Sequence, residues 1–349
     1  MRLFLPSQRG PVRARIASLI LLAGLVLPIW VRSPQLPEPE GNGLALARQR
    51  LPDGGRLARD LGPLHLEGAW QLTGARAGGY SALVPVGDGQ LLAISDGGMW
   101  LHLDMRTGAP FRHAYDKVGL ATRSNEKQDR DVESAFRDPR SGAIWLGMEG
   151  VNAIVRTDAQ LHEEQRVQPA AMRDWAVNSG PEAMTRLLDG RFLVLRETPT
   201  PGTGGRLHEA VLFAGDPVEG GKARRLQFAG PRNFSAVDAA TLPDGRVLVL
   251  MRRLVWPAPL TFAGRIVIAD PHDIAQGETW TSQEVAVLAS DMPLDNFEGM
   301  AVREGAQGGV EIWLISDDNF MRHWQRTLLW KLSVDPAQLP GRDTSKHIR

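Results

Sequence analysis

The chain of 349 residues contains no cysteine. Disulfides and thiolate-ligated metal sites are therefore excluded, although the redox compartment stays undetermined because an oxidising space also tolerates a cysteine-free chain. Lysine plus arginine and aspartate plus glutamate number 40 each, so no net charge attracts nucleic acid, and no basic run is interleaved with aromatic residues. We therefore expect no nucleic-acid partner.

Two common hydrolase motifs are also missing. The chain has no Gly-x-Ser-x-Gly sequence, which disfavours an ordinary serine esterase. It has no His-Glu-x-x-His sequence, and its eight histidines are scattered rather than paired, which disfavours a zinc hydrolase. Any catalytic chemistry is therefore expected to rest on other residue types.

The N-terminus carries an export signal. Residues 1–15 are basic, residues 16–31 form an uncharged apolar run, and residues 32–56 form a linker rich in proline and glycine. The apolar run is longer than the roughly 7 to 15 residues of a signal-peptide core and shorter than the roughly 20 of a spanning helix. No clean Ala-x-Ala cleavage site follows it directly. We favour an uncleaved signal anchor in the bacterial inner membrane, with residues 1–15 cytoplasmic and the rest periplasmic; a cleaved signal that releases the protein into the periplasm is the alternative.

A pattern recurs five times in the rest of the chain. In each repeat an apolar segment opens beside a small or acidic residue, a turn follows, and a second apolar segment ends in charged residues. The opening positions are 81, 133, 182, 238 and 298, so the steps are 52, 49, 56 and 60 residues. A period in this range, made of short strands, is typical of a propeller or a solenoid.

Turn residues in these repeats indicate hairpins. Asp88-Gly89, Asp189-Gly190 and Asp244-Gly245 each separate two apolar runs, and Asp-Gly favours a hairpin because both turn positions accept a positive φ. One hairpin cannot bury both of its faces, so stacking around a common axis is expected. We predict an all-β fold, a β-propeller with five or six blades over residues 57–335, followed by a polar tail at 336–349.

Equivalent positions on the blades of a propeller form rings around its axis. The opening positions give a first ring of Glu133, Glu182, Asp238 and Glu298, with Ser81 as its neutral member. The ends of the second segments give a second ring, which consists of Asp96, Glu149, Arg196 with Glu197, Arg252 with Arg253, and Asp317 with Asp318. Both rings are expected to converge on one mouth of the propeller.

Concentrated carboxylates beside arginines either bind a cation and an anion or neutralise each other. In the first interpretation, Ca²⁺ or a similar ion is held by Glu133, Glu149, Glu298, Asp317 and Asp318. Arg196, Arg252 and Arg253 then hold an anionic group of a small substrate, and Glu182 and Asp238 are the candidate catalytic bases. In the second interpretation, the acids pair fully with these three arginines and only fix the register of the blades.

Several segments of the chain resemble a known family. The segments are 295–300 (Asp-Asn-Phe-Glu-Gly-Met), 315–320 (Ile-Ser-Asp-Asp-Asn-Phe), 325–329, 131–134 with 145–149, and 178–183. Together they are similar to the phytase-like family, also called esterase-like activity of phytase. The resemblance implies a β-propeller exported by bacteria, with Glu149, Glu298, Asp317 and Asp318 matching the acidic motifs of the family. In β-propeller phytases, acidic residues hold Ca²⁺ ions that bind substrate phosphates and activate water.

Two functions follow as hypotheses. The first is an exported, metal-assisted hydrolase of a phosphoester or another ester. The second is a non-catalytic propeller, tethered to the inner membrane through residues 16–31, that binds a protein partner or a small anionic ligand. Complete pairing of the ring carboxylates with arginines is expected only for the second, because it leaves no place for a cation.

Overall fold

The computed structural model describes residues 43–51, 54–74, 77–106, 112–121, 129–255, 261–274, 279–289 and 292–341. The predicted basic segment 1–15 and the apolar segment 16–31 lie outside these residues, as do the first part of the linker 32–56 and the last part of the tail 336–349. Among the elements that are described, no helix combines the length and the apolar character needed to cross a bilayer.

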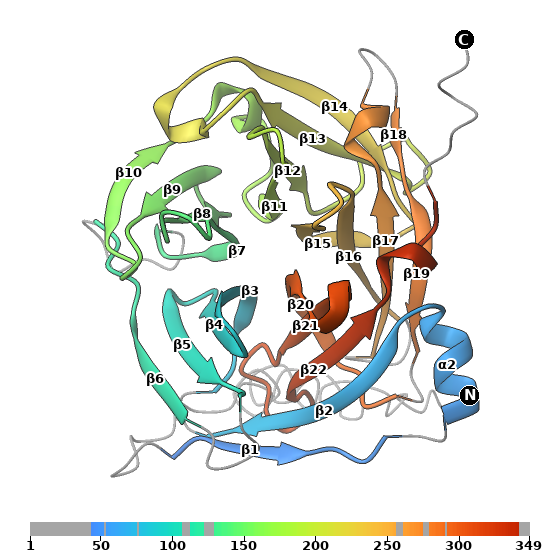
Figure 1. The fold of residues 1–349 in the computed structure, drawn as a ribbon. Helices are drawn as coiled ribbons and strands as arrows, with labels where there is room; N and C mark the ends of the chain where they lie inside the picture. The colour runs from blue at the N-terminus through green and yellow to red at the C-terminus, as the bar shows by residue number, and fades with distance from the viewer. Residues whose placement is uncertain are drawn as a thin grey trace, which may run out of the picture.

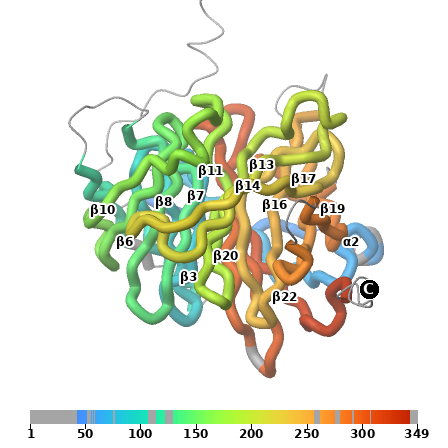
Figure 2. The backbone as a smooth tube through the Cα atoms, turned by 90° about the horizontal axis from the view of Figure 1, so that it is seen from above, coloured from blue at the N-terminus to red at the C-terminus, as the bar shows by residue number. Residues whose placement is uncertain are grey.

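Five sheets surround a central axis, and each forms one blade (Figure 1). The strands nearest the axis are β3 (Tyr80–Gly87), β7 (Val132–Arg137), β11 (Pro181–Arg186), β15 (Ser235–Thr241) and β20 (Asn296–Glu304). Figure 2 shows the same ring from its side. The predicted all-β propeller is therefore confirmed, and the described residues form five blades rather than six.

The outer strands complete the blades in chain order, except that β18, which lies between β17 and β19 in the sequence, pairs in parallel with β14 of the third blade. The first blade adds β4 (Gln90–Ser95), β5 (Met99–Asp104) and β6 (Arg112–Lys117), and the second adds β8 (Ile144–Met148), β9 (Ala153–Thr157) and β10 (Glu163–Val167). The third adds β12 (Phe192–Arg196), β13 (Leu207–Phe213), β14 (Ala223–Ala229) and β18 (Thr279–Thr281), and the fourth adds β16 (Val247–Leu254), β17 (Phe262–Ala269) and β19 (Gln283–Leu288). Short 3₁₀ turns lie in the connections: η2 (Ala170–Met172), η3 (Pro217–Glu219), η4 (Pro271–Asp273), η5 (Ala306–Gly308) and η6 (Pro336–Gln338).

The fifth blade closes the ring by joining the two ends of the chain. Its strands β20, β21 (Val310–Asp317) and β22 (Thr327–Val334) come from the C-terminal part, whereas β2 (His65–Thr73) and β1 (Ala45–Arg48) come from the N-terminal part. The β2 strand pairs antiparallel with β22. Residues 45–56 were predicted to belong to the linker, but residues 45–48 form β1 and residues 54–56 belong to helix α2 (Gly54–Leu61), which packs beside β19. The strand β1 has no counterpart in the repeats, because it is a short strand at the edge of its sheet.

The three Asp-Gly sequences form the predicted hairpin turns. Gly89, Gly190 and Gly245 all have positive φ, at 62°, 90° and 91°, and they connect β3 to β4, β11 to β12 and β15 to β16. Positive φ is strained for residues with a Cβ, so glycine suits these positions. In these three blades, local sequence therefore specifies the turn between the first two strands.

The hydrophobic core is divided among the interfaces between neighbouring blades. The described residues form five buried apolar clusters, and each joins side chains from two adjacent sheets. Phe192 of the third blade, for example, packs on Trp145 of the second, with ring centroids 5.2 Å apart. Complete burial of a side chain of this size stabilises the fold by about 1.5–3 kcal/mol. No blade buries both faces without its neighbours, which explains why the hairpins assemble radially.

The innermost strands approach one another closely at the axis. A Cβ on Gly299 of β20 would lie only 3.0 Å from the backbone of Ala82 in β3, so only glycine fits there without displacement. Ser81 donates a hydrogen bond of 2.5 Å to the Val132 carbonyl of the next blade, and Ser134 donates one of 2.5 Å to the Pro181 carbonyl. These two serines therefore link neighbouring blades at the axis.

Candidate metal centre at the acidic mouth

A bulge near the start of each innermost strand directs one side chain out of the regular ladder. The unpaired residues in the strand registers are Ser81, Glu133, Glu182, Val237 and Glu298. A bulge re-aims a side chain, and bulges are common beside functional sites. Because all five strands start at the same end of the axis, the three glutamates converge there. The first predicted ring is confirmed at four of its five positions.

The fifth predicted position was wrong. The bulge of β15 falls at Val237, one residue before Asp238, so Asp238 pairs with Leu250 in the regular ladder. The buried carboxylate of Asp238 accepts the N–H groups of Ala239 at 2.7 Å and of Met300 at 2.6 Å. Burial raises the pKa of Asp238 well above its usual value. Asp238 thus ties β15 to β20, and its role as a catalytic base stays a prediction that this geometry disfavours.

Two overlapping trios of carboxylates form the centre of the mouth. One contains Asp131, Glu133 and Glu149, and the other contains Glu149, Glu182 and Glu197. Within each trio, one oxygen per residue lies within 4.8 Å of the others. Glu149 belongs to both, because it follows β8 directly and lies between the bulges of β7 and β11. Clustered carboxylate oxygens are the donors that hard divalent cations prefer.

The electrostatics of the mouth favour added positive charge. Burial, followed by the charges of Glu298 and Asp131, raises the pKa of Glu133 well above its usual value. Burial, followed by the charges of Glu133 and Glu197, does the same to Glu182. These carboxylates therefore keep protons, or take up a cation, rather than ionise together. In the part of the chain that the structure describes, no lysine or arginine forms an ion pair with Glu133, Glu149 or Glu182.

Arg252 is the guanidinium that enters the cluster. Its Nη2 lies 2.8 Å from Glu298 Oε1 and 3.6 Å from Glu197 Oε1. Burial lowers the pKa of Arg252, but the surrounding carboxylates outweigh it and leave the pKa raised. One arginine thus compensates part of the charge and positions two of the glutamates.

The other two predicted arginines do not pair with the cluster. Arg196 Nε donates to Ser179 Oγ at 3.1 Å, and the guanidinium of Arg253 lies over the Phe234 ring at 4.8 Å from its centroid. The second interpretation, in which the acids pair fully with all three arginines, is therefore wrong for Arg196 and Arg253. Arg253 is exposed at the mouth, where its guanidinium can meet an incoming anion.

The two aspartates at the end of β21 have different surroundings. Asp317 is buried, and burial followed by the charges of Glu298 and Asp96 raises its pKa well above the usual value. Asp318 accepts the N–H groups of Phe320 at 3.0 Å and of Gly79 at 3.2 Å. Asp317 therefore faces the carboxylate cluster, whereas Asp318 fastens the β21–β22 connection to the first blade. Both aspartates lie at the predicted mouth, but neither belongs to the two carboxylate trios.

The structure adds members to the predicted set of cation ligands. Asp131 and Glu197 belong to the two trios, although no role had been assigned to either. Glu197 had a visible signal, because it follows its strand at the position that Glu149 occupies in the preceding blade. Asp131 has a weaker signal: it lies two residues before Glu133 and directly precedes β7.

The fold and the mouth define a five-bladed β-propeller with an acidic, carboxylate-rich opening at one end of its axis. The family model of phytase-like proteins, described as esterase-like activity of phytase, matches residues 75–320. The chain therefore belongs to the phytase-like family, as the sequence motifs indicated.

One solved structure agrees on the fold. An endo-arabinase from Bacteroides thetaiotaomicron VPI-5482 is similar with a TM-score of 0.50 at 9% identity, over 73% of this chain and 94% of that one. The structure of a nidogen/laminin complex matches with a TM-score of 0.42 at 10% identity, over 82% of this chain and 97% of that one. No curated protein sequence matches the chain. At such low identity the likeness concerns the propeller architecture alone.

Proposed function

We propose that the acidic mouth is a divalent-cation site that assists hydrolysis of a phosphoester or another ester. The observation that carries this proposal is the pair of carboxylate trios sharing Glu149. Among the described residues, no lysine or arginine forms an ion pair with three of their members, Glu133, Glu149 and Glu182. Membership of the phytase-like family supports the hydrolase class. Ca²⁺ is the first candidate, because it accepts six to eight oxygen ligands in flexible geometry.

The residues fit such an ion by the chemistry of their donors. Asp131, Glu133, Glu149 and Glu197 offer oxygen ligands from the two trios. A bound divalent cation would compensate their charge and make a bound water more acidic. Arg252 would hold Glu197 and Glu298 in place through its ion pairs.

The remaining groups supply proton transfer and recognition of the substrate. Glu182 is the candidate base, because a carboxylate with a raised pKa accepts a proton more effectively near neutral pH. In hydrolysis, Glu182 would take a proton from the attacking water and return it to the departing alkoxide as the ester bond breaks. Arg253 and Arg196 would bind the anionic part of the substrate, since neither forms an ion pair with a carboxylate of the cluster.

The test combines metal analysis with hydrolysis by the full-length chain. We expect bound Ca²⁺ or a similar ion, and turnover of para-nitrophenyl phosphate or para-nitrophenyl acetate that a chelator abolishes. Glu149→Gln should remove both properties, whereas Glu304→Gln, an exposed position at the other end of the axis, should retain them. Bound metal without turnover of any ester would favour the non-catalytic function, and absence of both metal and turnover would eliminate a working cation site.

We also propose that residues 16–31 tether the propeller to the periplasmic side of the inner membrane. The support is the apolar run with its basic flank. Fractionation of cells, followed by mass determination of the chain, tests this. Recovery of a shortened chain in the soluble periplasmic fraction would show a cleaved signal instead.

A further inference from the structure

A large cavity lies at the end of the axis opposite the acidic mouth. It has a volume of about 1020 Å³ and is lined by the C-terminal ends of all five innermost strands. The acidic residues occupy the N-terminal ends of the same strands, so the two sites are separated by the crowded middle of the ring. Ligand cavities of roughly 300–1,000 Å³ accommodate molecules of drug size.

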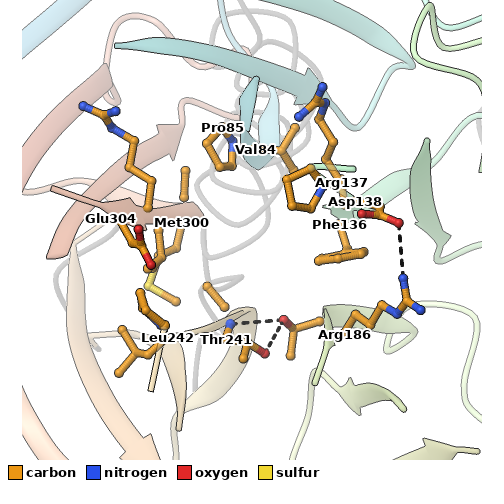
Figure 3. Close-up of a pocket in the computed structure, with 18 of the residues that line it drawn as sticks. Val84, Pro85, Phe136, Arg137, Asp138, Arg186, Thr241, Leu242, Met300 and Glu304 are labelled. Atoms are coloured by element: carbon orange, nitrogen blue, oxygen red, sulfur yellow. Dashed lines mark hydrogen bonds and ion pairs between the residues drawn. The ribbon is translucent and has the colours of Figure 1, made fainter. Parts of the chain in front are cut away.

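The walls of this cavity are mainly apolar. Figure 3 shows Val84, Pro85, Phe136, Leu242 and Met300 around an open centre. They come from four different blades, which gives the cavity apolar surface on several sides. Such walls favour the body of a hydrophobic ligand, whose transfer from water releases about 25 cal/mol for each Å² that is buried.

Charged groups at the rim are unevenly distributed. Arg186 lies 3.3 Å from Asp138, and Arg303 is bound by Glu311 and Asp88, so these two arginines are compensated. Figure 3 places Arg137 and Asp138 on one side of the opening and Glu304 on the other.

Arg137 and Arg140 supply uncompensated positive charge on the side of the second blade. Both line the cavity, and no described residue forms an ion pair with either guanidinium. Asp138, which lies between them in sequence, directs one oxygen to Arg186 and the other to the backbone N–H of Arg140. The two guanidiniums are therefore available to an anion.

A hydroxyl group adds a neutral donor to the wall. Thr185 Oγ1 accepts the backbone N–H of Thr241 at 3.1 Å, and the two hydroxyl oxygens are 2.9 Å apart. If the Thr185 hydroxyl donates to Thr241 Oγ1, the Thr241 hydroxyl proton is left for a ligand. Thr241 lines the cavity and is the less buried of the two.

We propose that this cavity binds a small anion with an apolar body, such as an aryl-alkyl or short acyl carboxylate or phosphate. The apolar part occupies the space between the blades, and Arg137 and Arg140 bind the anionic head by charge-assisted hydrogen bonds. The site is independent of the acidic mouth and of any hydrolysis there.

Calorimetric titration of the full-length chain in the presence of EDTA tests the proposal. The probes are 4-phenylbutyrate, 4-phenylbutyl phosphate and 4-phenylbutylamine, which share one apolar body and differ in their head group. We expect the two anions to bind and the amine to bind at least tenfold more weakly. The stronger of the two anions identifies the preferred head group. Equal or tighter binding of the amine would overturn the proposal.

Variants then locate the bound anion. The double substitution Arg137→Gln and Arg140→Gln should weaken anion binding at least tenfold, since a single charge-assisted hydrogen bond already contributes about that factor. Arg173→Gln, an exposed position outside the cavity, and Glu149→Gln at the acidic mouth should leave the affinity unchanged. A loss with Glu149→Gln, or none with the double variant, would place the anion elsewhere and refute the site.

A cavity-filling variant tests whether the apolar body of the anion enters the cavity. Ala240 lines the cavity and is half-buried, so Ala240→Phe would occupy part of its volume. Anion affinity should fall at least tenfold, with thermal unfolding confirming that the fold is retained. If this variant does not fold, the arginine variants decide alone. If it folds and binds as the parent does, the apolar body of the anion does not enter the cavity and the proposal fails.

Discussion

Replacement of Glu182 by glutamine is expected to stabilise the metal-free protein at pH 8, although most substitutions of buried residues destabilise. One oxygen of Glu182 lies within 4.8 Å of oxygens of Glu149 and Glu197. At this separation two unit charges repel by about 3 kcal/mol for an effective dielectric constant of about 20. Glutamine keeps the shape, has no charge, and can donate an N–H to Glu149. Allowing for screening, we expect the free energy of unfolding to rise by about 2 kcal/mol and Tm by about 4 °C.

The gain should disappear in acid. Burial and the neighbouring carboxylates raise the pKa of Glu182 well above 4.5 in the folded protein. Above pH 4.5 the unfolded chain loses this proton while the folded protein keeps it, so the folded state binds more protons. Stability therefore falls as pH rises through this range. Below pH 4.5 both states become largely protonated, and Glu182→Gln should approach the stability of the parent.

The assay is urea unfolding in the presence of EDTA, at pH 4 and at pH 8. Glu304→Gln serves as the control, because its side chain is exposed and lies outside the acidic mouth; it should change the free energy of unfolding by less than about 0.5 kcal/mol. Equal destabilisation by Glu182→Gln at both pH values would refute the idea that mutual repulsion governs the mouth. The measured effect would then report lost packing or a lost hydrogen bond.

Three further outcomes test the site and the fold. Arg252→Met should lower the free energy of unfolding by about 2–3 kcal/mol at pH 8 in EDTA, since it leaves the buried Glu298 carboxylate uncompensated; urea unfolding measures this, and a neutral result contradicts the ion pair. Ca²⁺ at 100 times its Kd should add about 2.7 kcal/mol to the parent and nothing to Glu149→Gln; scanning fluorimetry measures both, and an unchanged parent speaks against the cation site. Gly299→Ala should cost about 1–3 kcal/mol through its clash with the backbone of β3. Its matched control is Gly215→Ala, where a Cβ meets nothing within 4 Å, and equal Tm values for these two variants would contradict the close approach at the axis.

The bulge positions show how far local sequence specifies the candidate site. Glu133, Glu182 and Glu298 were found from the spacing of the repeats, because an acid at the start of each hairpin recurs with the blade period. Asp238 was misplaced because the repeat itself does not show which residue of a strand forms the bulge. That choice depends on pairing with β16, and a shift of one residue sends a side chain to the other face of the sheet.

The arginines also show what local sequence does not specify, namely which charged side chains form ion pairs. Sequence placed Arg196, Arg252 and Arg253 at one mouth, but it contains no information on which guanidinium reaches a carboxylate. In the folded chain Arg252 reaches Glu298, Arg196 turns to Ser179, and Arg253 lies over Phe234. The possible partners of each arginine differ by a few side-chain torsions. Contacts with neighbouring blades determine which partner is reached.

By itself, the sequence determined that this protein is a β-propeller with acids gathered at one mouth. Apolar alternation, Asp-Gly turns and the spacing of the repeats are local properties, and a hairpin that cannot bury both faces has to stack. Only the tertiary structure decided the number of blades, the closure of the ring by β1 and β2, and the trios around Glu149. Each of these depends on contacts between segments that are far apart in the chain, and the distance between two carboxylates is set by how whole blades pack rather than by their separation in sequence.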